Sequence, residues 1–275
     1  MPRAAATVRA YATDWRDFSS WCDAHGGARF PASPPTVATY VDELAGRVGV
    51  ATVRRRVAAI RARHIDRGLA SPTSAPEVQA AVARAEWRRR HDRTTTRPLG
   101  IDELRAVSRA VPEGVDGTRD RALVLVGYGA GLRPGELAAL RVEDVEFVAP
   151  GLSVRTPGGR KVVPFGSDKW LCAVGAWREW RRAAALRDGA AFRAVDRHGR
   201  VHDERLGVRG VTRIVQRAVA RAGLDPARYS GRSLRRGMVL AATEHGVSAG
   251  GIMAQTGHRS RRLVRRYMAE PPDAT

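Results

Sequence analysis

The chain has 275 residues, a length that supports two compact domains and needs no metal or disulfide for stability. Its 48 Lys and Arg residues outnumber its 28 Asp and Glu residues, and the net charge of +20 indicates a polyanionic partner, above all nucleic acid. Cys22 and Cys172 lie in no zinc-like spacing, and no stretch resembles a membrane helix or signal peptide, so we expect a cytoplasmic protein with reduced cysteines and no metal site.

Residues 1–93 are predicted to form an all-α domain. Apolar side chains recur there at intervals of three and four, which places them on one face of a helix that ends near Gly26. The side chains of this face, which we expect in the core, are Val8, Tyr11, Trp15, Phe18 and Trp21. Pro34 begins a second helix, and two more are predicted over residues 50–67 and 76–93.

The helix predicted over residues 50–67 has two contrasting faces. Val53, Val57, Ile60 and His64 are expected to point inward. The opposite face carries Arg54, Arg55, Arg56, Arg61 and Arg63. We expect this basic face to lie along a phosphate backbone, with a merely solvated surface as the alternative.

Residues 94–98 are predicted to be a linker, because this polar segment closed by proline has nothing to bury. The second domain, residues 99–275, begins with helical patterns. Helices are predicted over residues 101–111, 120–130 and 134–140. Short β-type runs, VEFV, LSVR and KVVPF, lie around residues 146–165, and helical periodicity resumes from Lys169. The predicted fold class is mainly α: an all-α N-terminal domain and an α-rich second domain with a small antiparallel sheet.

Three segments of the second domain carry residues suited to phosphodiester chemistry. Breaking a phosphodiester without a metal requires a side-chain hydroxyl as nucleophile and fixed cations beside the non-bridging oxygens. Arginine suits these oxygens because its planar, permanently charged fork meets them bidentately. The segments are GLRPGEL at 131–137, SLRRG at 233–237, and Gly257-His258 followed nine residues after the histidine by Tyr267.

In this order and spacing, the three segments closely resemble the arginine and tyrosine boxes of the tyrosine recombinase (phage integrase) family. The match runs through the whole second domain, whereas the N-terminal helices resemble the family's SAM-like core-binding domain by placement and size only. The resemblance implies a site-specific recombinase or integrase, which cleaves and rejoins DNA through a 3′-phosphotyrosyl intermediate without metal or other cofactor. It implies double-stranded DNA as partner, a homotetramer on DNA that is a monomer or weak oligomer when free, and nucleoid association without membrane contact.

The resemblance also assigns roles to individual residues. Arg133 and Arg235 would clamp the scissile phosphate, His258 would donate a hydrogen bond to it, and Tyr267 would be the nucleophile. Glu136 matches the acidic position of the first box, where we expect a structural partner for an arginine. Further DNA contacts are expected from Arg155 and Arg259.

Two positions depart from the family pattern. Arg232 stands where the family usually has histidine, and arginine keeps a positive donor but cannot exchange a proton near neutral pH. The family's hairpin lysine, which protonates the leaving 5′ oxygen, corresponds to Thr156. Lys161, on the other side of the Pro-Gly-Gly turn, could serve instead through a register shift. Arg155 is a weaker substitute, and the absence of a functional acid is the third alternative.

Two other functions stay open, and the departures at Arg232 and at the hairpin lysine motivate the first of them. A DNA-binding protein with the same fold and phosphate clamp but little or no cleavage would share every motif. A topoisomerase acting on one duplex would share the chemistry without needing paired sites.

Overall fold

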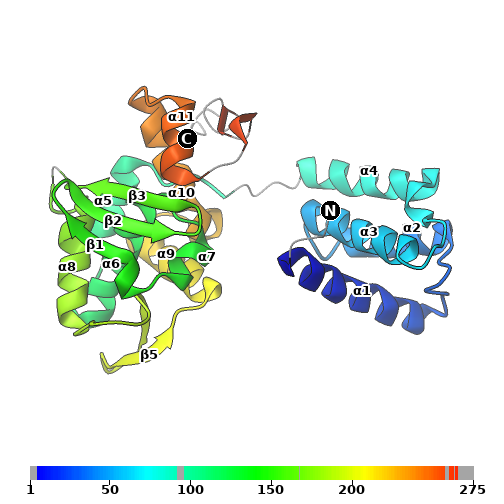
Figure 1. Ribbon diagram of the computed structural model, residues 1–275, viewed down its shortest axis with the longest axis horizontal. Helices are drawn as coiled ribbons and strands as arrows, with labels where there is room; N and C mark the ends of the chain where they lie inside the picture. The colour runs from blue at the N-terminus through cyan, green and yellow to red at the C-terminus, as the bar shows by residue number, and fades with distance from the viewer. Residues whose placement is uncertain (1–4, 92–95, 167, 258–259, 263, 266–275) are drawn as a thin grey trace. The chain divides into compact units, whose positions relative to one another are not determined.

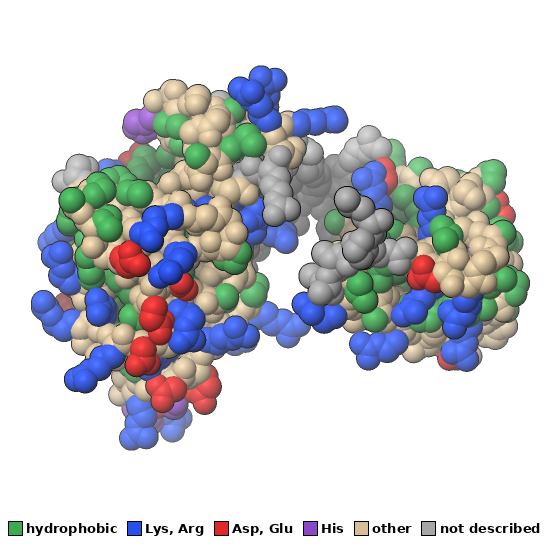
Figure 2. Space-filling model, in the orientation of Figure 1, with side chains coloured by type: hydrophobic (Ala, Val, Ile, Leu, Met, Phe, Trp, Pro, Cys, Tyr) green, Lys and Arg blue, Asp and Glu red, His purple; other side chains and the backbone are tan. Residues whose placement is uncertain are grey.

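The computed structural model describes residues 5–91, 96–166, 168–257, 260–262 and 264–265. The chain divides into two compact units, Met1–Thr94 and Thr95–Thr275 (Figure 1). Helices predominate in both, and the second unit adds small antiparallel sheets, which confirms the predicted fold class. Figure 2 shows Lys and Arg side chains over much of the viewed surface of each unit, with acidic side chains among them. Among the described residues, no helix has the length and apolar character needed to cross a membrane.

The first unit is a bundle of helices around one apolar core. Its elements are α1 (Ala5–His25), α2 (Pro34–Ala45), α3 (Val50–Ile65), the 3₁₀ turn η1 (Pro72–Ser74) and α4 (Pro76–His91). Phe18 and Trp21 of α1 are buried, as their spacing predicts, but Val8 is 52% exposed and that part of the prediction was wrong. Helical periodicity identifies a face, but it does not show where along the helix the neighbouring helices end.

His64 is buried on α3, as expected, and ties this helix to the chain before α2. The backbone N–H of Ala32 donates to its Nε2 at 3.1 Å, so Nδ1 carries the proton and donates to the carbonyl of Ile60 at 2.9 Å. Both ring nitrogens therefore satisfy backbone groups inside the first unit.

Several arginines of α3 are engaged in ion pairs within the first unit. Arg55 binds Asp14 of α1 bidentately at 2.7 and 2.9 Å, and Arg56 pairs with Asp14 and Asp17. Arg54 pairs with Glu86 of α4. Arg61 is exposed. The arginines of α3 thus stabilise helix packing in part, and the row is not a uniformly free basic face.

Replacing Arg55 is expected to destabilise the first unit. The carboxylate of Asp14 is 1% exposed, and Arg55→Met removes its bidentate partner while keeping an apolar stem of similar length. Because Arg56 still lies 3.6 Å away, we expect a loss of about 2 kcal/mol in unfolding free energy. Chemical denaturation measures this loss, and Arg61→Met, on the exposed side of the same helix, is the matched control. Equal unfolding midpoints for the two variants would contradict the assignment.

The second unit is built around α6, a helix whose second half is apolar on all sides. Its first elements are α5 (Ile101–Arg109), α6 (Val115–Gly129), α7 (Pro134–Ala139), the 3₁₀ turn η2 (Val142–Asp144), β1 (Val145–Val148), β2 (Gly151–Thr156) and β3 (Gly159–Pro164). After them come α8 (Ala173–Ala183), β4 (Arg193–Val195), β5 (Val201–Arg205), α9 (Val208–Arg221), the 3₁₀ turn η3 (Pro226–Arg228), α10 (Gly231–Glu244) and α11 (Ala249–Thr256). Residues 122–128 of α6 are all buried. A helical segment with no polar face must lie in the interior, so the second half of α6 is the central packing element.

The strands β1, β2 and β3 form an antiparallel sheet in that order, at the three places where the sequence predicts β-type runs. The second hairpin, β4–β5, was not predicted, since helical periodicity was extended from Lys169 to the end of the chain. Its strands are short and half-exposed, with a register irregularity between Arg193 and Val195, so no clear alternation marks them. The turn is closed by Asp196, which accepts from the backbone of His198 and Arg200.

The incoming segment of the second unit is fastened to the region of α10. The backbone N–H of Arg97 donates to the carbonyl of Arg228 at 2.7 Å, and that of Leu99 donates to Ser233 at 3.1 Å. A Cβ on Gly237 would lie 1.9 Å from the carbonyl oxygen of Leu99, so only glycine permits this approach. Arg236 of α10 also donates to the carbonyl of Thr96.

Candidate active site

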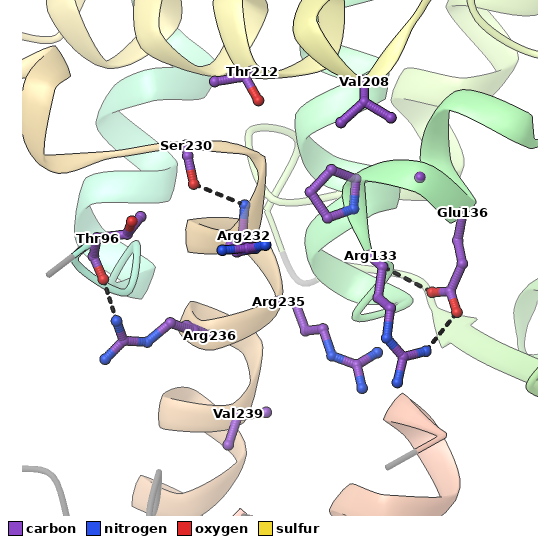
Figure 3. Close-up of a pocket in the computed structure, with 12 residues that line it drawn as sticks. Thr96, Arg133, Glu136, Val208, Thr212, Ser230, Arg232, Arg235, Arg236 and Val239 are labelled. Atoms are coloured by element: carbon purple, nitrogen blue, oxygen red, sulfur yellow. Dashed lines mark hydrogen bonds and ion pairs between the residues drawn. The ribbon is translucent and has the colours of Figure 1, made fainter. Parts of the chain in front are cut away.

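Two of the predicted arginine boxes meet at a cavity of about 880 Å³ in the second unit (Figure 3). Its lining includes Arg133, Glu136, Ser230, Arg232, Arg235 and Arg236. These residues come from the start of α7 and from α10. The structure thus brings together three of the predicted site arginines in one concave, strongly cationic place.

Arg133 is oriented by the turn between α6 and α7. After α6 ends at Gly129, Gly131 adopts a φ of +57° and turns the chain, which places Arg133 before Pro134 as the N-cap of α7. Glu136 accepts from the backbone N–H of Arg133 at 2.8 Å and from its Nη1 at 2.7 Å. Glu136 is therefore a structural partner of this arginine, as expected, and directs its exposed guanidinium into the cavity (Figure 3).

Arg235 lies in the first turns of α10 and is only 7% exposed. Its Nη1 donates to the carbonyl of Gly131 at 2.8 Å and to that of Thr256 at 2.6 Å. Figure 3 shows its guanidinium beside that of Arg133, with both groups directed to the same side. Arg235 thus joins the first box, α10 and the end of α11.

Arg232 lies at the N-terminus of α10, and its side chain is exposed at the same cavity. Its backbone N–H donates to the hydroxyl of Ser230, the N-cap of the helix. A guanidinium here adds positive charge beside the other two arginines, near a helix N-terminus that also favours anions.

Lys161 lies on the buried face of β3, opposite Val154 of β2, and is 1% exposed. Its Nζ donates to the carbonyl of Gln255 at 2.6 Å. Burial lowers the pKa of this amine, the charges of Arg235 and Arg133 lower it further, and Glu136 opposes them. The amine therefore lies within electrostatic reach of both arginines of the cavity.

The two other hairpin positions considered for the acid are placed differently. Thr156 donates its hydroxyl to the carbonyl of Gly159 and so closes the hairpin turn. Arg155 alternates with the inward Val154, and it contacts the carbonyl of Glu143 and the carboxylates of Asp144 and Glu146. Of these three hairpin positions, Lys161 is the one whose pKa is affected by the charges of Arg133 and Arg235, although Lys161 is buried and is not among the residues that line the cavity.

His258, Arg259 and Tyr267 lie outside the described residues. The residues beside them are placed: α11 ends at Thr256, and Gly257 follows with a φ of +68°. A side chain at Gly257 would meet the Nζ of Lys161 at 3.6 Å and the carbonyl of Gly158 at 3.4 Å. Val264, three residues before Tyr267, is fully buried in the core of the second unit.

The family model of the phage integrase family matches residues 98–272. An integrase/recombinase xerD homolog of Selenomonas ruminantium is 32% identical over 98% of this chain and 82% of its own length. The tyrosine recombinase XerC of Pelobacter propionicus is 28% identical over 95% of this chain and 83% of its own.

Solved structures show the same fold. The XerA recombinase aligns with a TM-score of 0.51 and 18% identity over 98% of this chain and 88% of that one. The XerH site-specific recombinase, solved with its palindromic difH substrate after cleavage, aligns with a TM-score of 0.58 and 15% identity over 86% of this chain and 68% of that one. The chain therefore belongs to the phage integrase family and is a tyrosine recombinase, an enzyme of site-specific recombination.

Proposed function

We propose that this protein cleaves and rejoins duplex DNA at a specific site through a 3′-phosphotyrosyl intermediate formed on Tyr267. The observation that supports this best is the pairing of Arg133 and Arg235, from segments distant in the sequence, at one cavity. Two adjacent guanidiniums match the non-bridging oxygens of a single phosphate, whose negative charge increases in the pentavalent transition state. Arg232 adds a third positive donor at the same place.

The proposed step balances without ATP or metal. The Tyr267 hydroxyl loses its proton to solvent water and its oxygen attacks phosphorus, the bond from phosphorus to the 5′ oxygen breaks, and Lys161 donates a proton to that oxygen. His258 donates a hydrogen bond to a non-bridging oxygen. The reverse step, by a 5′ hydroxyl of another strand, releases the tyrosine and joins the DNA, so the phosphodiester energy is conserved.

The proposed organisation assigns one task to each unit. Residues 1–93 act as a core-binding domain on the duplex, residues 94–98 form the linker between the domains, and residues 99–275 hold the catalytic groups. XerH was solved on a DNA substrate, and the net charge of +20 fits such a partner here. Arg61, which is exposed, and Arg259 are proposed phosphate contacts, so we expect DNA binding to weaken steeply as the salt concentration rises. We propose a homotetramer on two DNA sites for strand exchange.

Covalent capture on randomised DNA tests this function. In duplexes with a fixed nick inside a randomised segment, cleavage close to the nick releases a short fragment that carries the new 5′ hydroxyl. This fragment diffuses away, so the protein stays bound to the remaining strand through a 3′ phosphate. Adducts that survive denaturation, and whose sequences converge on one site, are the expected result. Binding without any adduct would favour the non-catalytic alternative. Relaxation of supercoiled DNA with no dependence on a second site would favour a topoisomerase.

The captured site also permits a test of Lys161 by pH. A proton donor works only while protonated, and the protonated fraction falls as pH rises through its pKa, which burial lowers here. We therefore expect the single-turnover cleavage rate to fall on the alkaline side at a lower pH than an ordinary lysine would allow. Lys161→Arg cannot lose its proton in this range, so this alkaline loss is expected to disappear while the rate is reduced. An unchanged profile in Lys161→Arg would exclude Lys161 as the donor.

A further inference from the structure

The last turn of α11 connects three segments that are distant in the sequence. The side-chain nitrogen of Gln255 donates to the carbonyl of Gly129, at the end of α6, at 3.1 Å. The same nitrogen donates to the carbonyl of Val162 in β3 at 2.9 Å. The backbone carbonyl of Gln255 accepts from the Nζ of Lys161 at 2.6 Å. One half-buried amide side chain therefore joins α11 to α6 and β3, and the backbone carbonyl of the same residue fixes the direction of the Lys161 amine.

Gln255 can bond to the backbone of β3 because β3 is an edge strand. In the order β1-β2-β3, one side of β3 pairs with β2, and no strand of the described residues lies beside the other. The backbone carbonyl of Val162 accepts from the side chain of Gln255, and Nζ of Lys161, from the buried face of the strand, donates to the backbone carbonyl of Gln255. A lysine has four rotatable methylenes, so a buried amine keeps one position only if an acceptor fixes it.

The residue after Gln255 makes the second connection. The carbonyl of Thr256 accepts from Nη1 of Arg235 at 2.6 Å, and the hydroxyl of Thr256 donates back to Ile252 at 2.6 Å. Two neighbouring carbonyls at the negative end of α11 thus hold the two cations, Lys161 and Arg235. Any displacement of this turn moves both.

We propose that Gln255 is a positioning residue, whose amide fixes the last turn of α11 so that its carbonyl directs the Lys161 ammonium toward the phosphate held by Arg235. The inference rests on the proposed function, in which Lys161 protonates the leaving 5′ oxygen. Gln255 itself touches neither DNA nor the reacting atoms. Its loss should therefore affect the proton transfer more than DNA binding.

A DNA strand with sulfur in place of the 5′ bridging oxygen at the captured site isolates the proton transfer. Cleavage of this strand breaks a phosphorus–sulfur bond and releases a thiolate. Thiols have a pKa of about 8.5, whereas water has a pKa of about 15.7 and alcohols behave similarly, so the thiolate leaves without a proton. A variant that lacks only the correctly placed acid is slow on oxygen and restored on sulfur. A variant with a damaged phosphate clamp or fold is slow on both.

The test compares Gln255→Leu with Gln216→Leu on both strands. Gln216 is the matched control, because its side chain also donates to two backbone carbonyls of the second unit, those of Pro226 and Tyr229. Gln255→Leu is expected to cleave the oxygen strand roughly 10- to 100-fold more slowly, part of the effect of a general acid, at unchanged DNA affinity. On the sulfur strand it should regain the rate of the unsubstituted protein. Gln216→Leu should show the same relative rate on both strands.

Lys161→Ala separates the two proposals. If Lys161→Ala is restored by sulfur but Gln255→Leu is equally slow on both strands, or unimpaired on oxygen, the role of Gln255 is wrong and that of Lys161 stands. If Lys161→Ala itself is not restored, the assignment of the acid fails. Thermal unfolding checks that each variant is folded, and Gln255→Met, of similar length and also without donors, replaces Gln255→Leu if the latter is not.

Discussion

Tyr267→Phe is expected to lower covalent adduct formation by at least about 10⁴-fold, because it removes the attacking oxygen and little else. DNA affinity should stay close to that of the unsubstituted protein, since the ring and the surrounding charges are kept. The measurement is the fraction of captured duplex that migrates with protein on a denaturing gel, beside a binding titration of the same duplex. The proposed function makes this the largest effect of any single substitution.

Tyr229→Phe is the matched control for this loss. Tyr229 is buried in the same unit, and its hydroxyl donates to Glu103 at 2.8 Å, so the change removes an equivalent oxygen away from the proposed chemistry. This variant should be somewhat less stable but should still form the adduct. An adduct in Tyr267→Phe would show that another hydroxyl attacks the phosphorus.

Arg235→Ala is expected to lower the single-turnover cleavage rate by about 10³-fold, the scale found when a fixed donor to a developing oxyanion is removed. The guanidinium would contact the phosphate and also hold the carbonyls of Gly131 and Thr256, so its removal loosens both sides of the cavity. Arg235→Lys should recover only part of the rate, because an ammonium keeps the charge but lacks the planar fork. Rates are compared on the captured duplex at saturating protein.

Arg182→Ala serves as the control for Arg235→Ala. Arg182 is an exposed residue at the end of α8 and does not line the cavity, so its loss removes one charge from the same unit. It should change affinity slightly and the saturated rate not at all. Because Arg235 is buried, unfolding curves must show that its variants are folded at the assay temperature. Equal cleavage rates for Arg235→Ala and Arg182→Ala at saturating protein would show that Arg235 does not stabilise the phosphate in the transition state.

Local patterns predicted much of the second unit. The runs VEFV, LSVR and KVVPF become β1, β2 and β3 because alternating or fully apolar β-branched residues suit strands wherever they pack. The hairpin β4–β5 escaped prediction, because its short strands bury too little apolar surface to show a period of two. The prediction that Val8 is buried was wrong for a related reason, because a helical period defines a face of a helix but not how far along the helix that face is covered.

The candidate site shows the same division. The motifs indicate that Arg133 and Arg235 belong to one site, and the cavity is lined by both. Counting along the hairpin places the family's usual lysine position at Thr156. Lys161 nevertheless carries the inward amine, because it pairs with Val154, and residues that pair across two strands lie on the same face of the sheet. Gln255 was missed, because an isolated glutamine near a helix end has no pattern. Its role becomes apparent only from its hydrogen bonds to Gly129, Lys161 and Val162.

The attachment of residues 96–99 to α10 has a mechanical consequence. The chain that arrives from the first unit is bonded to Arg236 and passes against Gly237, and Arg235 precedes both on the same helix. A displacement of the backbone at Thr96 therefore acts directly on α10, the helix that bears Arg235, and does not have to pass through the core around α6. The position of residues 96–99 and the position of the helix that bears Arg235 are in this way linked through a few hydrogen bonds.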